Sequence, residues 1–88
     1  MKFLVIEDNE ALNAAVADAL LPLGTSDSAY DGEDGYFMAK TESYDLIVLD
    51  LMLPKMSGTD LLAKLRADSN CPLLILTALD DGHKKIEG

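Results

Sequence analysis

Residues 3–9 read Phe-Leu-Val-Ile-Glu-Asp-Asn, and residues 46–50 read Leu-Ile-Val-Leu-Asp. Both stretches are short apolar runs that end abruptly in acidic residues. A third run, Leu-Leu-Ile-Leu at residues 73–76, is followed by Thr77. Unbroken runs of this length, rich in Leu, Ile and Val, are typical of strands that are buried on both faces. The sequence therefore predicts three buried strands.

The spacing of apolar residues after the first run predicts an amphipathic helix of about three turns. Its apolar stripe consists of Leu12, Ala15, Val16, Ala19 and Leu20. The polar residues that fall away from this stripe are Glu10, Asn13 and Asp18. Asn9 is suited to cap the start of the helix, and Pro22 with Gly24 ends it.

The later segments continue this alternation of strand and helix. Residues 25–29 are short and polar, and we interpret them as an edge strand. A second helix opens at Asp31 or Gly32 and ends near Ser43, and its aromatic and methionine side chains at residues 36–38 are expected to pack in the core. A third helix starts at residues 57–58 and turns three leucines inward, Leu61, Leu62 and Leu65. Asp80 and Asp81 suit the first turn of a fourth helix.

Strands that alternate with helices in this order predict βαβ units with right-handed crossovers, and hence an α/β fold with a parallel sheet between helices. With 88 residues the chain provides one domain. Its hydrophobic content of 49% excludes a disordered acidic tail. Its net charge of -9 argues against tight binding to nucleic acid or to an anionic membrane.

The cysteine content and the N-terminus indicate where the protein is found. The chain has one cysteine, Cys71, which cannot form an internal disulfide, and this fits a reducing compartment. The apolar run at residues 3–6 is far shorter than a signal-peptide core or a membrane span. We therefore expect a cytoplasmic protein without membrane attachment.

Chemistry is expected at the carboxyl ends of the strands, where ligands bind in open α/β sheets. Glu7, Asp8 and Asp50 occupy these positions, with Thr77 after the last run. Taken singly, each acid would be explained as a turn former or a helix cap. Together, three carboxylates repel one another unless a cation holds them, and oxygen ligands suit Mg²⁺ or Mn²⁺ better than zinc. Asp50 follows four large apolar residues and is expected to be partly buried, where an unpaired carboxylate is costly.

In this order, the residues resemble those of a bacterial response-regulator receiver domain, of the subfamily in which the receiver precedes a winged-helix DNA-binding domain. The resemblance rests on Phe-Leu-Val-Ile-Glu-Asp-Asn at 3–9, Tyr-Asp-Leu-Ile-Val-Leu-Asp-Leu-Met-Leu-Pro at 44–54, Met-Ser-Gly at 56–58 and Leu-Thr-Ala at 76–78. It spans essentially the whole chain. It implies a flavodoxin-like three-layer sandwich whose parallel sheet has the strand order 2-1-3-4.

The same resemblance implies a role for each site residue. Asp50 would be the phosphoacceptor, which takes a phosphoryl group from the phosphohistidine of a sensor histidine kinase. Asp8 and Asp50 would bind Mg²⁺ directly, with the backbone carbonyl of Met52 as a third protein ligand. Glu7 would act on the metal through water, and the hydroxyl of Thr77 would sense the phosphate. The resemblance thus implies a phosphoacceptor in phosphorelay signal transduction and transcription regulation, not an enzyme that acts on a separate substrate.

The sequence departs from the family pattern at its end. Family members continue through a fourth helix, a fifth strand that ends in Lys-Pro and a fifth helix, whereas this sequence stops at Gly88. The expected domain is therefore an incomplete receiver at residues 1–88, without the fifth strand, the fifth helix or an output domain. Without a fifth strand, the stretch from Leu73 to Thr77 would be an exposed apolar edge. We expect either self-association through this edge, as a homodimer or a domain-swapped assembly, or a longer native protein.

Single positions in the sequence argue against two alternatives to a receiver. A haloacid-dehalogenase-like phosphatase needs a second Asp two residues after Asp50, where this chain has Met52. A dinucleotide-binding domain needs a glycine-rich turn after the first strand, where this chain has acidic residues. The alternative that stays open is a truncated interaction or dimerisation module without efficient phosphotransfer.

Overall fold

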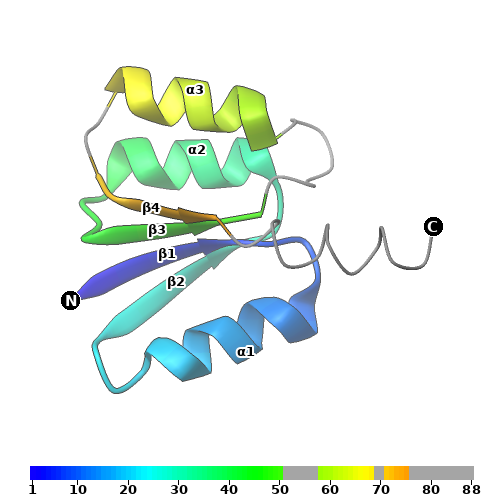
Figure 1. The fold of residues 1–88 in the computed structure, drawn as a ribbon, viewed down its shortest axis with the longest axis vertical. Coiled ribbons are helices and arrows are strands. Elements are labelled where there is room, and N and C mark those ends of the chain that lie inside the picture. The colour runs from blue at the N-terminus through cyan, green and yellow to red at the C-terminus, as the bar shows by residue number, and fades with distance from the viewer. Residues whose placement is uncertain (51–57, 69–70, 76–88) are drawn as a thin grey trace.

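The computed structural model describes residues 1–50, 58–68 and 71–75 of the chain. Within these ranges it shows a parallel sheet with helices on both faces (Figure 1). The predictions for Met52, Ser57, Leu76, Thr77 and the fourth helix lie outside the described residues.

Four strands form the sheet, in the order β2-β1-β3-β4, and every pairing is parallel. Their bounds are Lys2–Ile6 for β1, Thr25–Ala29 for β2, Leu46–Leu49 for β3 and Leu73–Ile75 for β4. All four lie where the sequence predicts strands, including the polar edge strand β2, although β1 begins one residue earlier than predicted, at Lys2. The order 2-1-3-4 confirms the flavodoxin-like topology.

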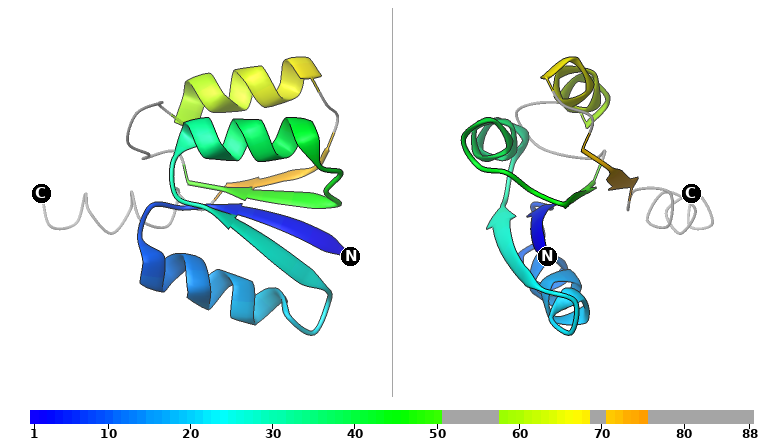
Figure 2. Two further views of the ribbon diagram at one scale, coloured as in Figure 1. Left: turned by 180° about the vertical axis from the view of Figure 1, so that it is seen from behind. Right: turned by 90° about the vertical axis from the view of Figure 1, so that its left-hand side faces the viewer.

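Among the described residues, three helices cover the two faces of the sheet. Helix α1, Glu10–Leu20, lies on one face, and α2, Gly32–Thr41, and α3, Gly58–Asp68, lie side by side on the other (Figures 1 and 2). This arrangement is the three-layer sandwich that the alternation of strands and helices predicted. In the part of the chain that the structure describes, no helix has the length and apolar character needed to span a membrane.

Side-chain caps define where two of the helices begin. The side chain of Asn9 accepts a hydrogen bond from the Leu12 N–H at 2.9 Å, and Asp31 accepts one from the Asp34 N–H at 2.8 Å. Each cap satisfies an N–H that has no partner within the helix. The cap at Asn9 and the start of α2 at Gly32 agree with the sequence prediction, whereas α2 ends at Thr41, slightly before the predicted end near Ser43.

The core lies between the two central strands and the pair α2 and α3. Residues 3–6 of β1 and 47–49 of β3 are all buried. Leu4 and Ile6 pack in one cluster with Leu61 and Leu65 of α3, which turn inward as predicted. Burial of each such side chain stabilises the fold by roughly 1.5–3 kcal/mol.

Gly35 allows α2 to approach β1 closely. A Cβ atom at this position would lie 2.6 Å from Cδ1 of Ile6, well inside van der Waals contact. Because Ile6 is itself fully buried, it has no room to move away. The position of Ile6 at the end of β1 therefore requires a glycine at residue 35 of α2.

The structure corrects the predicted buried face of α1. Asn13, which the predicted stripe excludes, is completely buried, whereas Ala15 and Ala19 of that stripe are exposed. The buried or half-buried residues of α1 are Asn13, Val16, Ala17 and Leu20, with Leu12 beside them. Asn13, Val16, Ala17 and Leu20 have the i, i+3, i+4, i+7 spacing of a helix face. The buried stripe therefore keeps Leu12, Val16 and Leu20 of the predicted one and is rotated from it toward Asn13 and Ala17.

Two further expectations about the core are wrong in part. Phe37 was expected in the core with its neighbours, but its side chain is 66% exposed, while Tyr36 and Met38 pack against the core cluster. Leu74 of β4 is half-exposed, so this strand is not buried on both faces as its apolar sequence suggested. Burial depends on the position of a strand or helix face in the assembled sandwich, which apolar composition alone does not give.

Candidate functional site

The register of the sheet brings the predicted acidic residues together. Ile6 of β1 pairs with Leu49 of β3, so Glu7 and Asp50 follow adjacent strands at the same level. The N–H of Asp50 donates to the carbonyl of Ile6 at 3.0 Å, which extends this alignment to the site. One carboxylate oxygen from each of Glu7, Asp8 and Asp50 lies within 4.8 Å of the other two. We call these three residues the acidic cluster.

The members of the acidic cluster differ in their contact with solvent. Glu7 and Asp50 are only 2% and 3% exposed, whereas Asp8 is exposed. The burial of Asp50 confirms the expectation drawn from the four apolar residues before it. The cluster is therefore a site with buried carboxylates at its base and one carboxylate at its rim, open to a partner from solvent.

Glu7 is the most strongly perturbed member of the acidic cluster. Its Oε2 accepts a hydrogen bond from the Asn9 N–H at 2.8 Å, but its buried Oε1 has no hydrogen-bond partner among the described residues. Burial, followed by the neighbouring Asp50 carboxyl, raises the pKa of Glu7 to about 8, against the opposing effect of the Asn9 N–H. A buried carboxyl oxygen without a partner is costly, and a bound cation would satisfy it.

The backbone around Glu7 is held by its neighbours in the fold. The N–H of Glu7 donates to the carbonyl of Ala29 at 3.0 Å, which ties the end of β1 to the end of β2. Asn9 both caps α1 and donates its N–H to Glu7. The turn from β1 into α1 thus positions the first two acids of the cluster before any ligand binds.

Asn13 is a site-adjacent residue that sequence reasoning assigned to the wrong face. Its side-chain amide donates to the carbonyls of Glu7, Ala29 and Val5 at 3.1, 3.2 and 3.3 Å. The helical spacing of Asn13 with Val16, Ala17 and Leu20 is the sequence signal for its burial. A polar side chain at the start of such a stripe is, however, expected to be exposed. The amide is buried because it replaces water as the donor to carbonyls at the strand ends.

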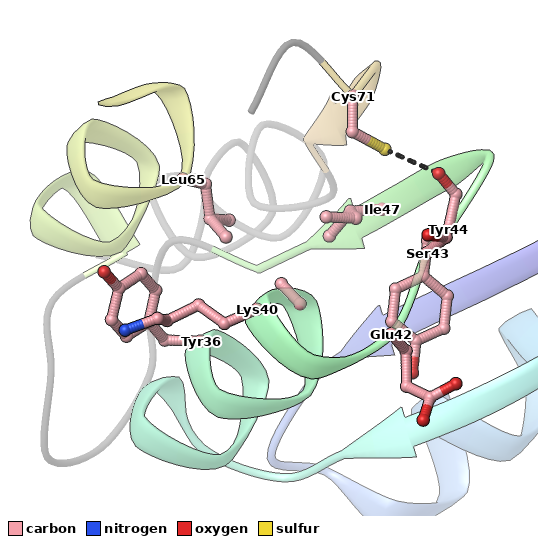
Figure 3. Close-up of a pocket in the computed structure, with 9 residues that line it drawn as sticks. Tyr36, Lys40, Glu42, Ser43, Tyr44, Ile47, Leu65 and Cys71 are labelled. Carbon is pink, nitrogen blue, oxygen red and sulfur yellow. Dashed lines mark hydrogen bonds between the residues drawn. The ribbon is translucent and has the colours of Figure 1, made fainter. Parts of the chain in front are cut away.

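A pocket of about 490 Å³ lies at the opposite end of the sheet, near the starts of β3 and β4 (Figure 3). Its lining residues are Tyr36, Ala39, Lys40, Glu42, Ser43, Tyr44, Ile47, Leu65 and Cys71. The thiol of Cys71 donates to the carbonyl of Tyr44 at 3.3 Å, and burial raises the pKa of that thiol. The pocket shares no residue with the acidic cluster, so it lies apart from the predicted chemistry.

The donor set of the acidic cluster fits a hard divalent cation. All three ligand groups are carboxylates, Glu7 has an unsatisfied buried oxygen, and Asp8 leaves the site open to solvent. Mg²⁺ and Mn²⁺ prefer such oxygen ligands, and Mg²⁺ usually keeps several waters as well. The remaining predicted site residues, Met52 and Thr77, lie outside the described residues.

Comparison with known proteins agrees with this fold. Residues 3–88 match the response regulator receiver domain family. The transcriptional regulatory protein HprR of Escherichia coli strain K12 is 39% identical over 89 residues, which cover 100% of this chain and 40% of HprR. The chain spans about 40% of the length of curated relatives such as HprR of Escherichia coli and DltR of Streptococcus agalactiae.

Solved structures give the same assignment. The receiver domain of the Francisella response regulator 1452 superposes with a TM-score of 0.83 at 35% identity, covering 98% of this chain and 73% of that one. DrrB of Thermotoga maritima, described as an OmpR/PhoB homologue, has a TM-score of 0.72 at 29% identity, covering 85% of this chain and 35% of DrrB. The chain therefore belongs to the response regulator receiver domain family of two-component systems, with OmpR-type transcriptional regulators among its relatives.

Proposed function

We propose that Asp50 is the phosphoacceptor of this receiver domain. The observation that carries this proposal is the burial of Asp50 at the end of β3, beside Glu7 and Asp8 and within 4.8 Å of an oxygen of each. An oxygen of the Asp50 carboxylate forms a bond to phosphorus while the P–N bond of a phosphohistidine breaks. The electron pair of that bond leaves on the imidazole nitrogen, and the product is an acyl phosphate. The donor is a sensor histidine kinase.

The acidic cluster would hold Mg²⁺ during this transfer. Asp8 and Asp50 would bind the ion directly together with the backbone carbonyl of Met52, and Glu7 would bind it through water. When bound, Mg²⁺ offsets the negative charge of the carboxylates and of the incoming phosphoryl oxygens. Glu7, for its part, keeps one oxygen fixed by the Asn9 N–H and presents the other to the cluster. Mn²⁺ is expected to substitute for Mg²⁺.

Phosphorylation would act on the rest of the protein through a change of charge. The hydroxyl of Thr77 would turn to the new phosphoryl group, and the loop that follows would change conformation with it. In this proposal residues 1–88 function as the receiver unit, and regulated transcription is the output, as the description of HprR as a transcriptional regulatory protein suggests.

Phosphorylation by a small-molecule donor tests the proposal directly. The chain is incubated with acetyl phosphate and Mg²⁺, and its intact mass is measured together with that of Asp50→Asn. We expect a phosphoryl adduct on the native chain and none on the variant, because the amide nitrogen and oxygen of Asn are poor nucleophiles. An adduct of equal yield on Asp50→Asn would place the chemistry on another residue.

A second candidate function is an interaction or dimerisation module without efficient phosphotransfer. It is favoured by β4, which in the described part of the chain is an edge strand with Leu74 half-exposed. Light scattering across a range of protein concentrations separates the two functions. Self-association together with no phosphoryl adduct would support the module, whereas an adduct on a monomer would support the receiver.

A further inference from the structure

Asn13 occupies the point where α1 meets the carboxyl ends of β1 and β2. Its side chain is completely buried, although it sits only one turn from the start of the helix. Its amide group faces Val5 and Glu7, in and directly after β1, and Ala29 at the end of β2. A polar side chain in such a position is retained only where its hydrogen bonds are satisfied.

The orientation of the Asn13 amide is defined on both sides. Its Nδ2 donates toward three backbone carbonyls, with distances of 3.1 Å to Glu7, 3.2 Å to Ala29 and 3.3 Å to Val5. Its Oδ1 accepts a hydrogen bond from the hydroxyl of Ser28 on β2. Because an amide donates only through nitrogen, the Ser28 hydroxyl and the three carbonyls all select the same orientation.

These contacts restrain Glu7 from several directions. The N–H of Glu7 is bound to Ala29, its carbonyl to Asn13, and its Oε2 to the N–H of Asn9. The backbone of Glu7 leads directly into Asp8, so its direction also determines where the Asp8 carboxylate lies. Asn13 thereby links the helix and two strands to the acidic cluster, although it does not belong to the cluster.

We propose that Asn13 is a positioning residue for the acidic cluster: by holding the Glu7 carbonyl, it sets the arrangement of carboxylates that determines the affinity for Mg²⁺. This inference rests on the proposed function, since it concerns the same cation. A leucine has the same branched side-chain skeleton but would leave the strand-end carbonyls without their donor. The specific role of the amide is therefore to fix a direction rather than to fill volume. Residues that orient ligands in this way commonly change metal affinity by about 10–100-fold when they are removed.

The test uses two variants and a matched control. Asn13→Ala removes the amide, and Ser28→Ala keeps the amide but removes the hydroxyl that orients it. Leu65→Ala is the control, because Leu65 is buried in the core on α3 and lines the pocket at the far end of the sheet. For each folded chain, the Kd for Mg²⁺ and the hydrogen-exchange rates of the Glu7 and Asn9 amides are measured by NMR.

We expect Asn13→Ala to weaken Mg²⁺ binding by about tenfold and to speed exchange of both amides. Ser28→Ala should have a smaller effect in the same direction. Leu65→Ala should lower the melting temperature and leave the Kd of the folded chain unchanged. This contrast separates positioning from general destabilisation, which lowers the folded fraction but not the affinity of the folded state.

The other outcomes overturn the inference or the function separately. If the native chain binds Mg²⁺ and folded Asn13→Ala binds it equally well, the inference is wrong and the proposed function stands. If the native chain binds no Mg²⁺, the proposed function fails, and the amide-exchange rates then decide whether Asn13 positions Glu7. If Asn13→Ala does not fold, Ser28→Ala decides: a native Kd and native exchange in that variant contradict the inference.

Discussion

Polar groups have different surroundings at the two ends of the sheet. Near the amino ends of the strands they are paired with one another. Lys2 Nζ lies 2.6 Å from Glu42 Oε1, and the Lys2 backbone N–H donates to Asp45 at 2.7 Å. The Tyr44 hydroxyl donates to Asp27 at 2.7 Å. At the carboxyl ends, three carboxylates lie together, and one buried oxygen of Glu7 has no partner among the described residues.

This difference distinguishes polar groups whose partners lie within the fold from carboxylates that lie against one another. Paired groups lower the free energy of the folded protein without any additional partner. The acidic cluster raises it, since buried carboxylates repel one another and lose hydration. A group that costs stability in the free protein and fits a cation is a strong indicator of function.

Asp8→Ala should have the largest effect on the carboxyl end. Asp8 is exposed, so its loss should leave the stability almost unchanged while it removes one proposed direct ligand. We expect the Kd for Mg²⁺ to rise on the order of 100-fold, measured by NMR titration, and phosphorylation by acetyl phosphate to fall with it. Native affinity in this variant would remove Asp8 from the metal site.

Glu7 should make the metal-free protein less stable as the pH rises. Its pKa is raised from about 4.5 to about 8 in the folded chain, so the folded state holds a proton that the unfolded state has lost. Its contribution to stability is thus fully present below about pH 4.5 and is lost as the pH rises to about 8. We expect a loss of up to about 5 kcal/mol across this window, since each pKa unit corresponds to about 1.4 kcal/mol.

Chemical denaturation of the native chain and Glu7→Gln between pH 5 and pH 8 measures this effect. Glutamine keeps an acceptor for the Asn9 N–H but does not ionise, so the variant should show a flatter dependence on pH. Equal slopes for the two proteins would show that Glu7 does not titrate in this range.

Mg²⁺ should stabilise the folded chain through the carboxyl end alone. At about ten times its Kd, a ligand that binds only the folded state raises the free energy of unfolding by about 1.4 kcal/mol. Asp50→Asn should lose most of this gain, and chelation should reverse it in the native chain. A melting temperature that does not respond to Mg²⁺ would contradict the metal site.

Tyr44→Phe should have the smallest effect of the four changes, and only on stability. It removes the hydrogen bond that the Tyr44 hydroxyl donates to Asp27. Burial, together with the Asp27 carboxylate, raises the pKa of this hydroxyl. We expect a loss of about 0.5–1.5 kcal/mol in urea denaturation, with the Kd for Mg²⁺ unchanged. A shift in Mg²⁺ affinity would show that the two ends of the sheet are coupled.

Much of the acidic cluster was predictable because two separate sequence signals coincide there. Apolar runs of four residues identify central strands, and parallel strands bring the residues that follow them to one edge. Glu7, Asp8 and Asp50 were therefore expected to meet, and they do. The cap at Asn9 was equally accessible, since it depends on local backbone geometry alone.

The same reasoning failed for Asn13 because burial of a polar group depends on partners distant in sequence. Its acceptors lie 6, 8 and 16 residues away, and its orienting hydroxyl on Ser28 lies 15 residues away. Phe37 fails in the reverse direction: its apolar side chain predicts burial, but it points away from the core cluster. In both cases the orientation of the helix on the sheet decides whether the side chain is buried.

The sequence by itself determined the alternation of strands and helices, the layers and which acids share a site, because periodicity and chain connectivity are properties of the chain read in order; the strand order was implied only by the resemblance to receiver domains. Only the tertiary structure decided which face of α1 is buried, and with it the contact between Asn13 and the Glu7 carbonyl. It also decided that Glu7 has a satisfied oxygen and an unsatisfied one. The physical reason is that hydration is lost group by group when the layers pack, so the cost and the partner of each polar atom exist only in the assembled fold.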